Sequence, residues 1–301
     1  MASPVKNVVL IGAGGNLGPS ILKQFLASSL NVTVLSRPES KSTFPSEVKV
    51  VRSDYSPDSL KSAFTGQDAV VSLVGTPAFG AQQTIIDAAI AAGVKRFIPS
   101  EYGCNTQSPD VISLVPFLGG KRQVVEYLQS KESSISWTAL ITGPFFDWGL
   151  KVGFLGFNVA EKKATLWDGG EAEFAVSNLD TVGKALVALL SNGAAYNKSK
   201  NDYVHLASHV VTQKQILASL ERVTGAKFDV VANVDTDARV QEVGAKLAKG
   251  DFSSATDLLL AATYGKKQQL GKFPKYWNDE LGLPKEDLDQ IVKETVDGKR
   301  P

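Results

Sequence analysis

Short apolar runs alternate with helical patterns through the first half of the chain. The β-rich runs lie at 5–11, 31–35, 48–52, 69–74, 96–99 and 137–141. Helical patterns stand between them, after Pro19 and at 59–64, 84–92 and 121–130. Several of the runs are continuously apolar, which is typical of a parallel sheet that helices cover on both faces. The alternation therefore predicts an α/β fold with a Rossmann-like, doubly wound parallel sheet.

The pattern changes after Phe145, where aromatic and glycine residues crowd the chain up to Trp167. A helix at 180–190 and a strand at 203–206 are predicted to join the same sheet. The later segments that we expect are a helix capped by Thr212 and ending at 223, a strand at 227–231 and a charged amphipathic helix at 235–249.

These elements predict two parts. The first is a Rossmann domain at 1–150, with 178–206 adding to its sheet. The second is a smaller substrate-binding subdomain, here called the lid, formed by 151–177 and 207–301. The chain shows no internal repeat and no Pro/Ser/Gly-rich linker between the parts.

Composition narrows the classes of function. The 301 residues include 32 Lys+Arg and 31 Asp+Glu, so the formal net charge is +1, which removes the broad electrostatic argument for nucleic acid or anionic membrane as the main partner. No apolar run approaches the roughly 20 residues of a membrane span. The single cysteine, Cys104, and the lack of a basic-then-apolar leader predict a cytoplasmic location. With His205 and His209 as the only histidines, no multi-histidine metal centre is expected and a Ser-His-Asp triad is poorly supplied.

A glycine-rich turn lies between the first strand and the first helix. Its residues are Gly12, Ala13, Gly14, Gly15, Asn16, Leu17 and Gly18. Glycine permits the tight turn and lets a pyrophosphate approach the backbone, where free N–H groups lie at the positive end of the helix. The alternative is a purely structural turn. The strand before, the helix after and the further alternations favour dinucleotide binding.

The end of the second strand predicts which dinucleotide is bound. NAD-binding proteins place an acidic residue there for the ribose 2′-hydroxyl, whereas this chain has Arg37 and, beyond a proline, Glu39. Arg37 can form a forked pair with a 2′-phosphate, and Lys41 can add a second charge. We therefore predict NADP(H) rather than NAD(H). The alternative is that Arg37 only pairs with Glu39 on a solvated loop.

Other coenzyme contacts are expected where later strands end. Asp54 and Tyr55 follow the third strand, where an acid can accept from the adenine amino group, although Asp54 can equally cap the next helix. The remaining predicted contacts, toward the nicotinamide, are Gly75, Thr76, Gly143 and Pro144.

Two lysines compete as the catalytic residue. Short-chain dehydrogenases use a Tyr-x-x-x-Lys pair, which Tyr127 and Lys131 match literally, but that pair lies at the helix end opposite the predicted coenzyme edge. Lys121 lies at the helix start, and Phe117 occupies the tyrosine position before it. A partly desolvated amine near a helix N-terminus has a lowered pKa, which suits Lys121 as general acid/base. The alternative is that Lys121 only binds the coenzyme ribose.

Aromatic residues predict a flat apolar substrate. The candidate wall residues are Tyr102, Phe145, Phe146, Trp148 and Phe157. Tyr102 is also the candidate for a second proton donor. The alternative for each of these residues is simple packing of the lid.

The stretch at 91–103 (AAGVKRFIPSEYG), with the glycine turn, Arg37 and Lys121, resembles the isoflavone reductase-like family. This family includes phenylcoumaran benzylic ether and pinoresinol-lariciresinol reductases. It belongs to the atypical short-chain dehydrogenases, alongside fungal nitrogen-repression-regulator-like proteins. The resemblance covers the first 150 residues, and segments 142–148 and 163–169 extend it toward fungal members.

The resemblance implies that the glycine turn, Arg37 and Lys41 bind NADPH and that Lys121 is the catalytic lysine. It implies a monomer or homodimer that reduces small aromatic or conjugated molecules. The chain has Val125 and Glu126 where plant members have paired arginines, and about two extra residues before the sixth strand. The plant substrates are therefore not carried over.

We expect an NADPH-dependent reductase of a small aromatic, quinone-like or enone metabolite. Two alternatives remain at this point. One is a non-catalytic redox sensor that binds NADP(H) and then a partner protein. The other is a redox-neutral isomerase that uses the same pocket.

Overall fold

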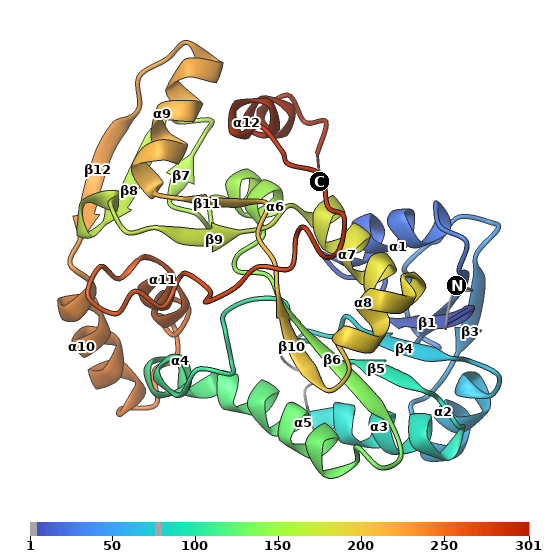
Figure 1. The fold of residues 1–301 in the computed structure, drawn as a ribbon. Helices are drawn as coiled ribbons and strands as arrows, with labels where there is room; N and C mark the ends of the chain where they lie inside the picture. The colour runs from blue at the N-terminus through green and yellow to red at the C-terminus, as the bar shows by residue number, and fades with distance from the viewer. Residues whose placement is uncertain (1–4, 76–79, 301) are drawn as a thin grey trace.

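The computed structural model describes residues 5–75 and 80–300, and its centre is a parallel sheet (Figure 1). Within these residues the sheet has seven strands in the order β10-β6-β5-β4-β1-β2-β3. Their bounds are β1 (Asn7–Ile11), β2 (Asn31–Ser36), β3 (Lys49–Arg52), β4 (Ala69–Ser72), β5 (Arg96–Ile98), β6 (Ser136–Ile141) and β10 (Asp202–His205). The prediction of a Rossmann-like parallel sheet is confirmed, and the expected strand near 203–206 pairs with β6.

Helices cover both faces of the sheet, which explains why its strands are apolar on both sides. One face carries α1 (Gly18–Leu26), α7 (Leu179–Ser191) and α8 (Gly193–Lys198). The other carries α2 (Pro57–Phe64), α3 (Gln82–Ala91) and α5 (Gly119–Ser130). Between α3 and α5 the chain also forms α4 (Pro109–Leu114) and a short 3-10 turn, η2 (Pro116–Leu118).

The strand order changes direction beside β1, which pairs with β4 on one side and β2 on the other. The loops that follow β1 and β4 therefore leave the sheet toward opposite faces. In open α/β sheets this switch point forms a crevice at the carboxyl ends of the strands, where ligands bind. The glycine turn follows β1 directly, so the fold places it at this crevice.

The segments predicted as the lid, described here for 151–177 and 207–300, contain short strands and peripheral helices, and their residues Phe273, Trp277 and Leu281 pack into the core of the sheet. Its strands are β7 (Phe157–Asn158), β8 (Lys163–Trp167), β9 (Phe174–Val176), β11 (His209–Val211) and β12 (Asp229–Val234). Its helices are α9 (Gln213–Thr224), α10 (Thr236–Leu247), α11 (Asp257–Tyr264) and α12 (Leu288–Val296), and α6 (Phe146–Lys151) leads into it. The two lid helices that the sequence predicted are present, and Thr212 forms a capping box with Gln215 as expected. The strands β7, β8, β9 and β11 and the helices α4, α6, α8, α11 and α12 were not predicted.

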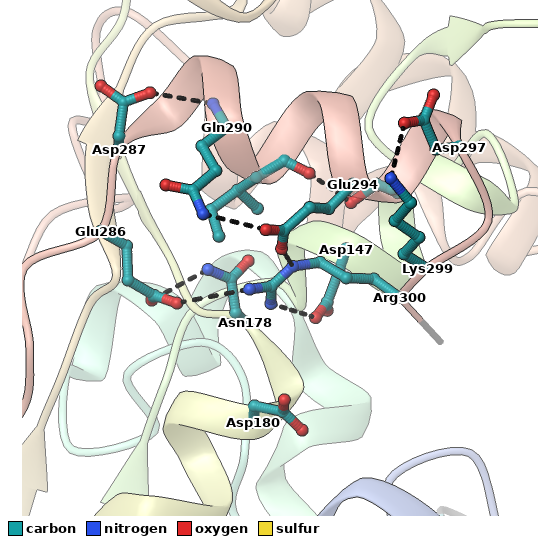
Figure 2. A network of polar contacts seen from close by, with 12 residues as sticks. Asp147, Asn178, Asp180, Glu286, Asp287, Gln290, Glu294, Asp297, Lys299 and Arg300 are labelled. Carbon is teal, nitrogen blue, oxygen red and sulfur yellow. Dashed lines mark hydrogen bonds and ion pairs between the residues drawn. The ribbon is translucent and has the colours of Figure 1, made fainter.

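Arg300 lies in a polar network where the lid meets the sheet domain (Figure 2). Its guanidinium is 2.8 Å from the carboxylate of Glu294, 3.7 Å from Asp147 and 3.9 Å from Glu286. Asn178, which precedes α7, donates its side-chain amide to Glu286 at 2.9 Å. One arginine thus links α12 to α6 and to the start of α7. Across the described residues, no helix combines the length and apolar character of a membrane span.

Candidate coenzyme and catalytic site

The turn after β1 requires glycine at its two ends. Gly12 has φ +82°, and a Cβ there would lie 2.8 Å from the carbonyl oxygen of Leu73. A Cβ on Gly18 would lie 1.9 Å from the carbonyl oxygen of Ala13. Backbone N–H groups of Gly15 and Gly18 donate within the turn, each at 3.0 Å. The turn is therefore tight, and α1 begins directly behind it, which is the arrangement that suits a pyrophosphate.

A cavity of about 250 Å³ opens beside this turn. It brings together part of the predicted coenzyme set, because Gly12–Gly15 line it together with Arg37 and Tyr55. Its remaining lining residues are Leu35, Ser36, Ser40, Ser42 and Phe44. Of the other predicted contacts, Asn16 and Lys41 are exposed nearby and Leu17 packs against the core.

Arg37 is exposed and lies 3.3 Å from the carboxylate of Glu39. About two thirds of each side chain is in contact with solvent, at 69% and 68%. An ion pair this exposed contributes little free energy, so Arg37 can exchange Glu39 for a phosphate at small cost. The ion pair with Glu39, which the sequence suggested as the alternative role of Arg37, is therefore present in this structure. The predicted contact of Arg37 with a 2′-phosphate stays a prediction.

Arg52 is a functional candidate that the sequence reasoning missed. It ends β3 beside Ser36 of β2, and its Nη1 donates to Ser36 Oγ at 3.0 Å. The same nitrogen donates to the carbonyl oxygens of Arg37 at 2.9 Å and Ser40 at 3.3 Å. Arg52 thereby shapes the loop that lines the cavity. A basic residue at the end of the predicted third strand, which lies parallel to the second strand, is the signal that could have identified Arg52 as a candidate.

Asp54 and Tyr55 lie where β3 leads into α2. The Asp54 carboxylate accepts from the backbone N–H of Ser56 at 3.0 Å and from its hydroxyl at 2.7 Å, and these bonds lower the pKa of Asp54. Asp54 therefore organises the turn before α2, but it does not cap that helix as the alternative from the sequence expected, because the N-cap residue is Ser56. Tyr55 has φ +63° and faces the cavity, and burial raises the pKa of its phenol.

The predicted nicotinamide contacts lie at the ends of β4 and β6. Gly75 is exposed, and Thr76 lies outside the described residues. Gly143 has φ +63°, and a Cβ there would lie 2.2 Å from the carbonyl oxygen of Ala175. Its N–H donates to the Gly103 carbonyl at 3.0 Å, while the Pro144 carbonyl accepts from Ser177 at 3.1 Å. These bonds connect the end of β6 with the segment after β5 and with the lid.

Lys121 is the third residue of α5 and is half-buried. Its Nζ donates to the backbone carbonyl oxygen of Glu101, in the segment that follows β5. Burial lowers the pKa of Lys121, and its electrostatic interactions with Glu101 and Cys104 oppose that effect. The amine is therefore directed toward the carboxyl end of the sheet, the edge on which the glycine turn lies.

The alternative tyrosine and lysine lie at the far end of α5. The Tyr127 hydroxyl donates to the carboxylate of Asp87 on α3 at 2.6 Å, which raises the pKa of Tyr127 to about 12. Lys131 follows the last helical residue, and its Nζ lies 5.1 Å from the centre of the Tyr127 ring. Both side chains thus have partners away from the carboxyl ends of the strands.

The aromatic residues divide into two groups. Phe146 and Phe157 are 0% and 1% exposed in the core cluster of the lid, where they pack as the alternative expected. Phe157 also lines a cavity of about 720 Å³, and the role of both residues toward a substrate stays a prediction. Phe145 is half-buried against the sheet core, and Trp148 is half-buried with its ring 6.2 Å from that of Phe154. These two remain available as wall residues.

Tyr102 is 7% exposed and adopts φ +29°, an uncommon conformation for a residue with a side chain. Its hydroxyl has no hydrogen-bond partner among the described residues, and burial raises the pKa of its phenol far above the usual range. Tyr102 as a second proton donor stays a prediction.

Both histidines pack against aromatic rings, His205 as the last residue of β10 and His209 as the first residue of β11. The ring of His205 lies 5.1 Å from that of Phe273, and burial lowers the pKa of His205 to about 4. The ring of His209 lies 5.8 Å from that of Phe146. In the parts of the chain that the structure describes, no three side chains of metal-binding type gather into a site.

Comparisons with known proteins add family evidence to this geometry. A family model described as the NmrA-like family matches residues 4–241. "Oxidoreductase aprR" from Aspergillus flavus is 35% identical, over 97% of this chain and 99% of that protein. "Isoflavone reductase homolog IRL" from Zea mays is 26% identical, over 76% of this chain and 77% of that protein.

Solved structures show the same fold. AtPrR2 with NADP+ and (+)pinoresinol superposes with a TM-score of 0.77, at 19% identity, over 97% of this chain and 99% of that one. The binary complex of leucoanthocyanidin reductase with NADPH from Vitis vinifera also gives 0.77, at 17% identity, over 96% of this chain and 99% of that one. Both likenesses extend through the lid as well as the sheet.

Proposed function

Because the chain belongs to the NmrA-like family, we propose that it is an NADPH-dependent oxidoreductase that reduces a small aromatic or conjugated metabolite, with Lys121 as the proton donor. The observation that carries this proposal is the position of Lys121. Its amine lies at the start of α5, held on the Glu101 carbonyl at the carboxyl end of the sheet.

The residues around the glycine turn fit a phosphorylated dinucleotide. The glycines at 12 and 18 leave no room for a Cβ, so the backbone at the turn stays open to a pyrophosphate. Arg37 and Lys41 supply exposed positive charge for the 2′-phosphate, while Tyr55 lines the cavity where the adenosine would lie. Gly75, Gly143 and Pro144 would lie beside the nicotinamide. Thr76, which lies outside the described residues, is expected beside it as well.

The substrate class rests on the aromatic residues that remain available and on the relatives. Phe145 and Trp148 offer flat apolar surface where β6 leads into α6. A solved neighbour holds an aromatic ligand, pinoresinol. We therefore propose a flat aromatic, quinone-like or enone substrate.

The proton step follows from the environment of Lys121. NADPH, when held at the glycine turn, would supply a hydride. Lys121 gives a proton to the substrate atom that becomes negative, the N–H electron pair stays on Nζ, and the neutral amine regains a proton from water. Because burial lowers the pKa of Lys121, proton transfer near neutral pH is easier than from an exposed lysine.

Replacement of Lys121 tests the proposal. Lys121→Ala is expected to lower kcat by about 10²- to 10⁴-fold with an enone or quinone substrate, while NADPH still binds. Coenzyme fluorescence measures binding, and NADPH absorbance measures turnover. Lys131→Ala is the matched control on the same helix and should retain turnover.

Three results would contradict the proposal or redirect it. Full turnover in Lys121→Ala removes the lysine from the reaction. Loss of NADPH binding alone in that variant assigns Lys121 to the ribose. Product formation without NADPH oxidation points to isomerase chemistry.

A second test concerns the choice of coenzyme. Arg37→Ala should weaken NADPH binding by about 10- to 100-fold, the size expected when a charged hydrogen bond is lost, and leave NADH binding unchanged. Calorimetry with both coenzymes measures the difference. Equal losses for NADPH and NADH would mean that Arg37 does not contact the 2′-phosphate.

A further inference from the structure

Lys121 and Glu101 meet in a way that the sequence did not predict. Glu101 is 1% exposed, in the segment between β5 and α4. Its backbone carbonyl accepts from Lys121 Nζ, and its side chain interacts electrostatically with the same amine. One residue thus acts on the amine through two different groups.

The backbone around Glu101 is shaped for this contact. Its N–H donates to the Pro99 carbonyl at 2.9 Å, which makes a very short turn. Tyr102 follows with φ +29°, and its N–H donates to the Leu140 carbonyl of β6 at 3.0 Å. A left-handed residue with a side chain costs free energy and persists only where its surroundings enforce it, often at functional sites. The strained turn directs the Glu101 carbonyl toward α5.

The carboxylate of Glu101 is deeply placed and only partly satisfied. Oε2 accepts a hydrogen bond from the hydroxyl of Thr106, which is 0% exposed. Oε1 is buried and has no hydrogen-bond partner among the described residues. A buried carboxylate with a free oxygen is costly unless a positive charge or a proton compensates it. Burial raises the pKa of Glu101, and the nearby cations Lys121 and Arg122, with the Thr106 hydroxyl, oppose that rise and favour the charged carboxylate.

Arg122 is already engaged in a second role. Its guanidinium donates to the carbonyl oxygens of Thr106 at 3.3 Å and Gln107 at 3.0 Å. It also lies 2.9 Å from the Glu126 carboxylate, one turn further along α5. Lys121 is therefore the cation that Glu101 holds with its own carbonyl.

We propose that Glu101 is the positioning residue for Lys121: its backbone carbonyl fixes the direction of the amine, and its buried carboxylate places a negative charge near that amine. The inference rests on the proposed function for its catalytic meaning. The contact between the two residues does not depend on that function.

The charged and titratable groups around Lys121 define the expected behaviour. Glu101 and Cys104 raise its pKa from the segment after β5, and burial lowers it. Tyr203 on β10 and Arg122 on α5 interact with Glu101 from the other elements. Removing the Glu101 charge leaves burial with less opposition, so the pKa of Lys121 should fall.

Glu101→Gln is the decisive variant because it keeps the backbone carbonyl, the size of the side chain and an acceptor for Thr106. The rate at which acetic anhydride acylates Lys121 in the coenzyme-free protein, read by mass spectrometry across pH, reports the pKa of that amine. The midpoint should move to lower pH by about one unit or more, as expected on loss of a nearby opposite charge. Lys131 in the same samples is the internal reference.

Glu126→Gln is the matched control. It removes an exposed carboxylate from α5 that pairs with Arg122, and solvent screens that charge from Lys121. The Lys121 midpoint should stay where it is in the wild type. An unchanged midpoint in Glu101→Gln, or equal shifts in both variants, would overturn the proposal.

A second pair of variants covers the case in which Glu101→Gln does not fold. Thr106→Val removes the hydroxyl donor from the carboxylate and should lower the Lys121 midpoint by a smaller amount. Thr106→Ser keeps the donor and should restore the wild-type value. No shift in Thr106→Val also contradicts the proposal.

Turnover measurements distinguish the contact between Glu101 and Lys121 from the role of Lys121 as proton donor. If Glu101 acts through Lys121, the alkaline fall of kcat should move to lower pH together with the acylation midpoint. A shifted midpoint with full turnover in Lys121→Ala would keep the Glu101 contact and refute the role of lysine as proton donor.

Discussion

The sheet domain and the lid are stabilised by different kinds of contact. In the sheet domain, residues 5–75 and 80–150 with 178–206, strands such as β4, which is buried along its whole length, lie between two helical layers. The turn after β1 is kept tight by close approach of backbone atoms at Gly12 and Gly18. In the lid, the strands are short, and buried polar side chains join them. Gln213 shows this, because its side chain bonds to the backbone of Leu155, Thr165 and Trp167. The sheet domain also contains a buried polar side chain, Arg96, which donates to Ser136 and Thr138 of β6. The lid should be sensitive to loss of Gln213, and the sheet domain to steric change at the turn after β1.

The largest effect is expected at the glycine turn after β1. Gly18→Ala places a Cβ 1.9 Å from the Ala13 carbonyl oxygen and should cost about 3 kcal/mol of unfolding free energy or more, with loss of NADPH binding. Gly15→Ala is the steric control, because its Cβ would be 3.4 Å from the nearest atom. Urea unfolding measures both variants. Similar losses of unfolding free energy in Gly18→Ala and Gly15→Ala would show that steric fit does not determine the stability of the turn.

The next effect is expected inside the lid. Gln213→Leu keeps the volume but leaves three backbone groups without partners, which should cost about 3 kcal/mol. Gln215→Leu, two residues along α9, removes an exposed capping contact and should cost about 1 kcal/mol or less. Thermal unfolding compares them. If Gln215→Leu proves as damaging, the lid does not depend on its buried polar contacts.

A third test uses pH. Burial raises the pKa of Asp147 from 3.8 to about 6, so its ionisation opposes folding. The cost is absent below about pH 4 and develops as pH rises through 6, reaching about 2 to 3 kcal/mol from the shift. Asp147→Asn removes the titration while it keeps an acceptor for the backbone N–H of Leu179.

The free energy of unfolding of Asp147→Asn relative to wild type should therefore increase between pH 4 and pH 7. Urea unfolding at several pH values measures the trend. If the difference in unfolding free energy between the variant and the wild type does not change with pH, Asp147 titrates normally and its surroundings are not of low dielectric constant.

The smallest effect is expected at Arg300. Arg300→Ala removes the partner of Glu294 and should cost about 1 kcal/mol, while the pKa of Asp147 rises further because Arg300 lowers it. Lys299→Ala is the control, since that side chain is 67% exposed and pairs with Asp297. Equal losses of stability in Arg300→Ala and Lys299→Ala would show that the polar network in Figure 2 does not stabilise the lid.

The same contrast explains what the sequence could predict. Apolar runs and a glycine turn are local signals, so the strands of the parallel sheet and the position of Lys121 on α5 followed from them. The two-residue β7 carries no such signal, since its pairing with β8 decides that it is a strand. The packing of Phe146 and Phe157 likewise depends on lid elements far along the chain.

Contacts between distant residues account for the rest. The Glu101 carbonyl accepts a hydrogen bond from Lys121 on α5. Arg52 lies beside the loop after β2 because β3 pairs with β2 so that Arg52 stands next to Ser36. Glu101 lies within the stretch 91–103 that carries the family resemblance, but nothing in that stretch singles it out, and Arg52 lies outside every motif that we used. Residue type and spacing alone do not show which backbone carbonyl a long side chain will meet.

The position of β10 has a consequence for how the molecule is made. This strand completes the edge of the sheet beside β6, yet residues 151–177 lie between the two in the chain. A ribosome therefore releases part of the lid before the sheet can close, and until then the nascent β6 presents an unpaired edge to other chains. Translation that pauses shortly before residue 202 should expose this edge for longest.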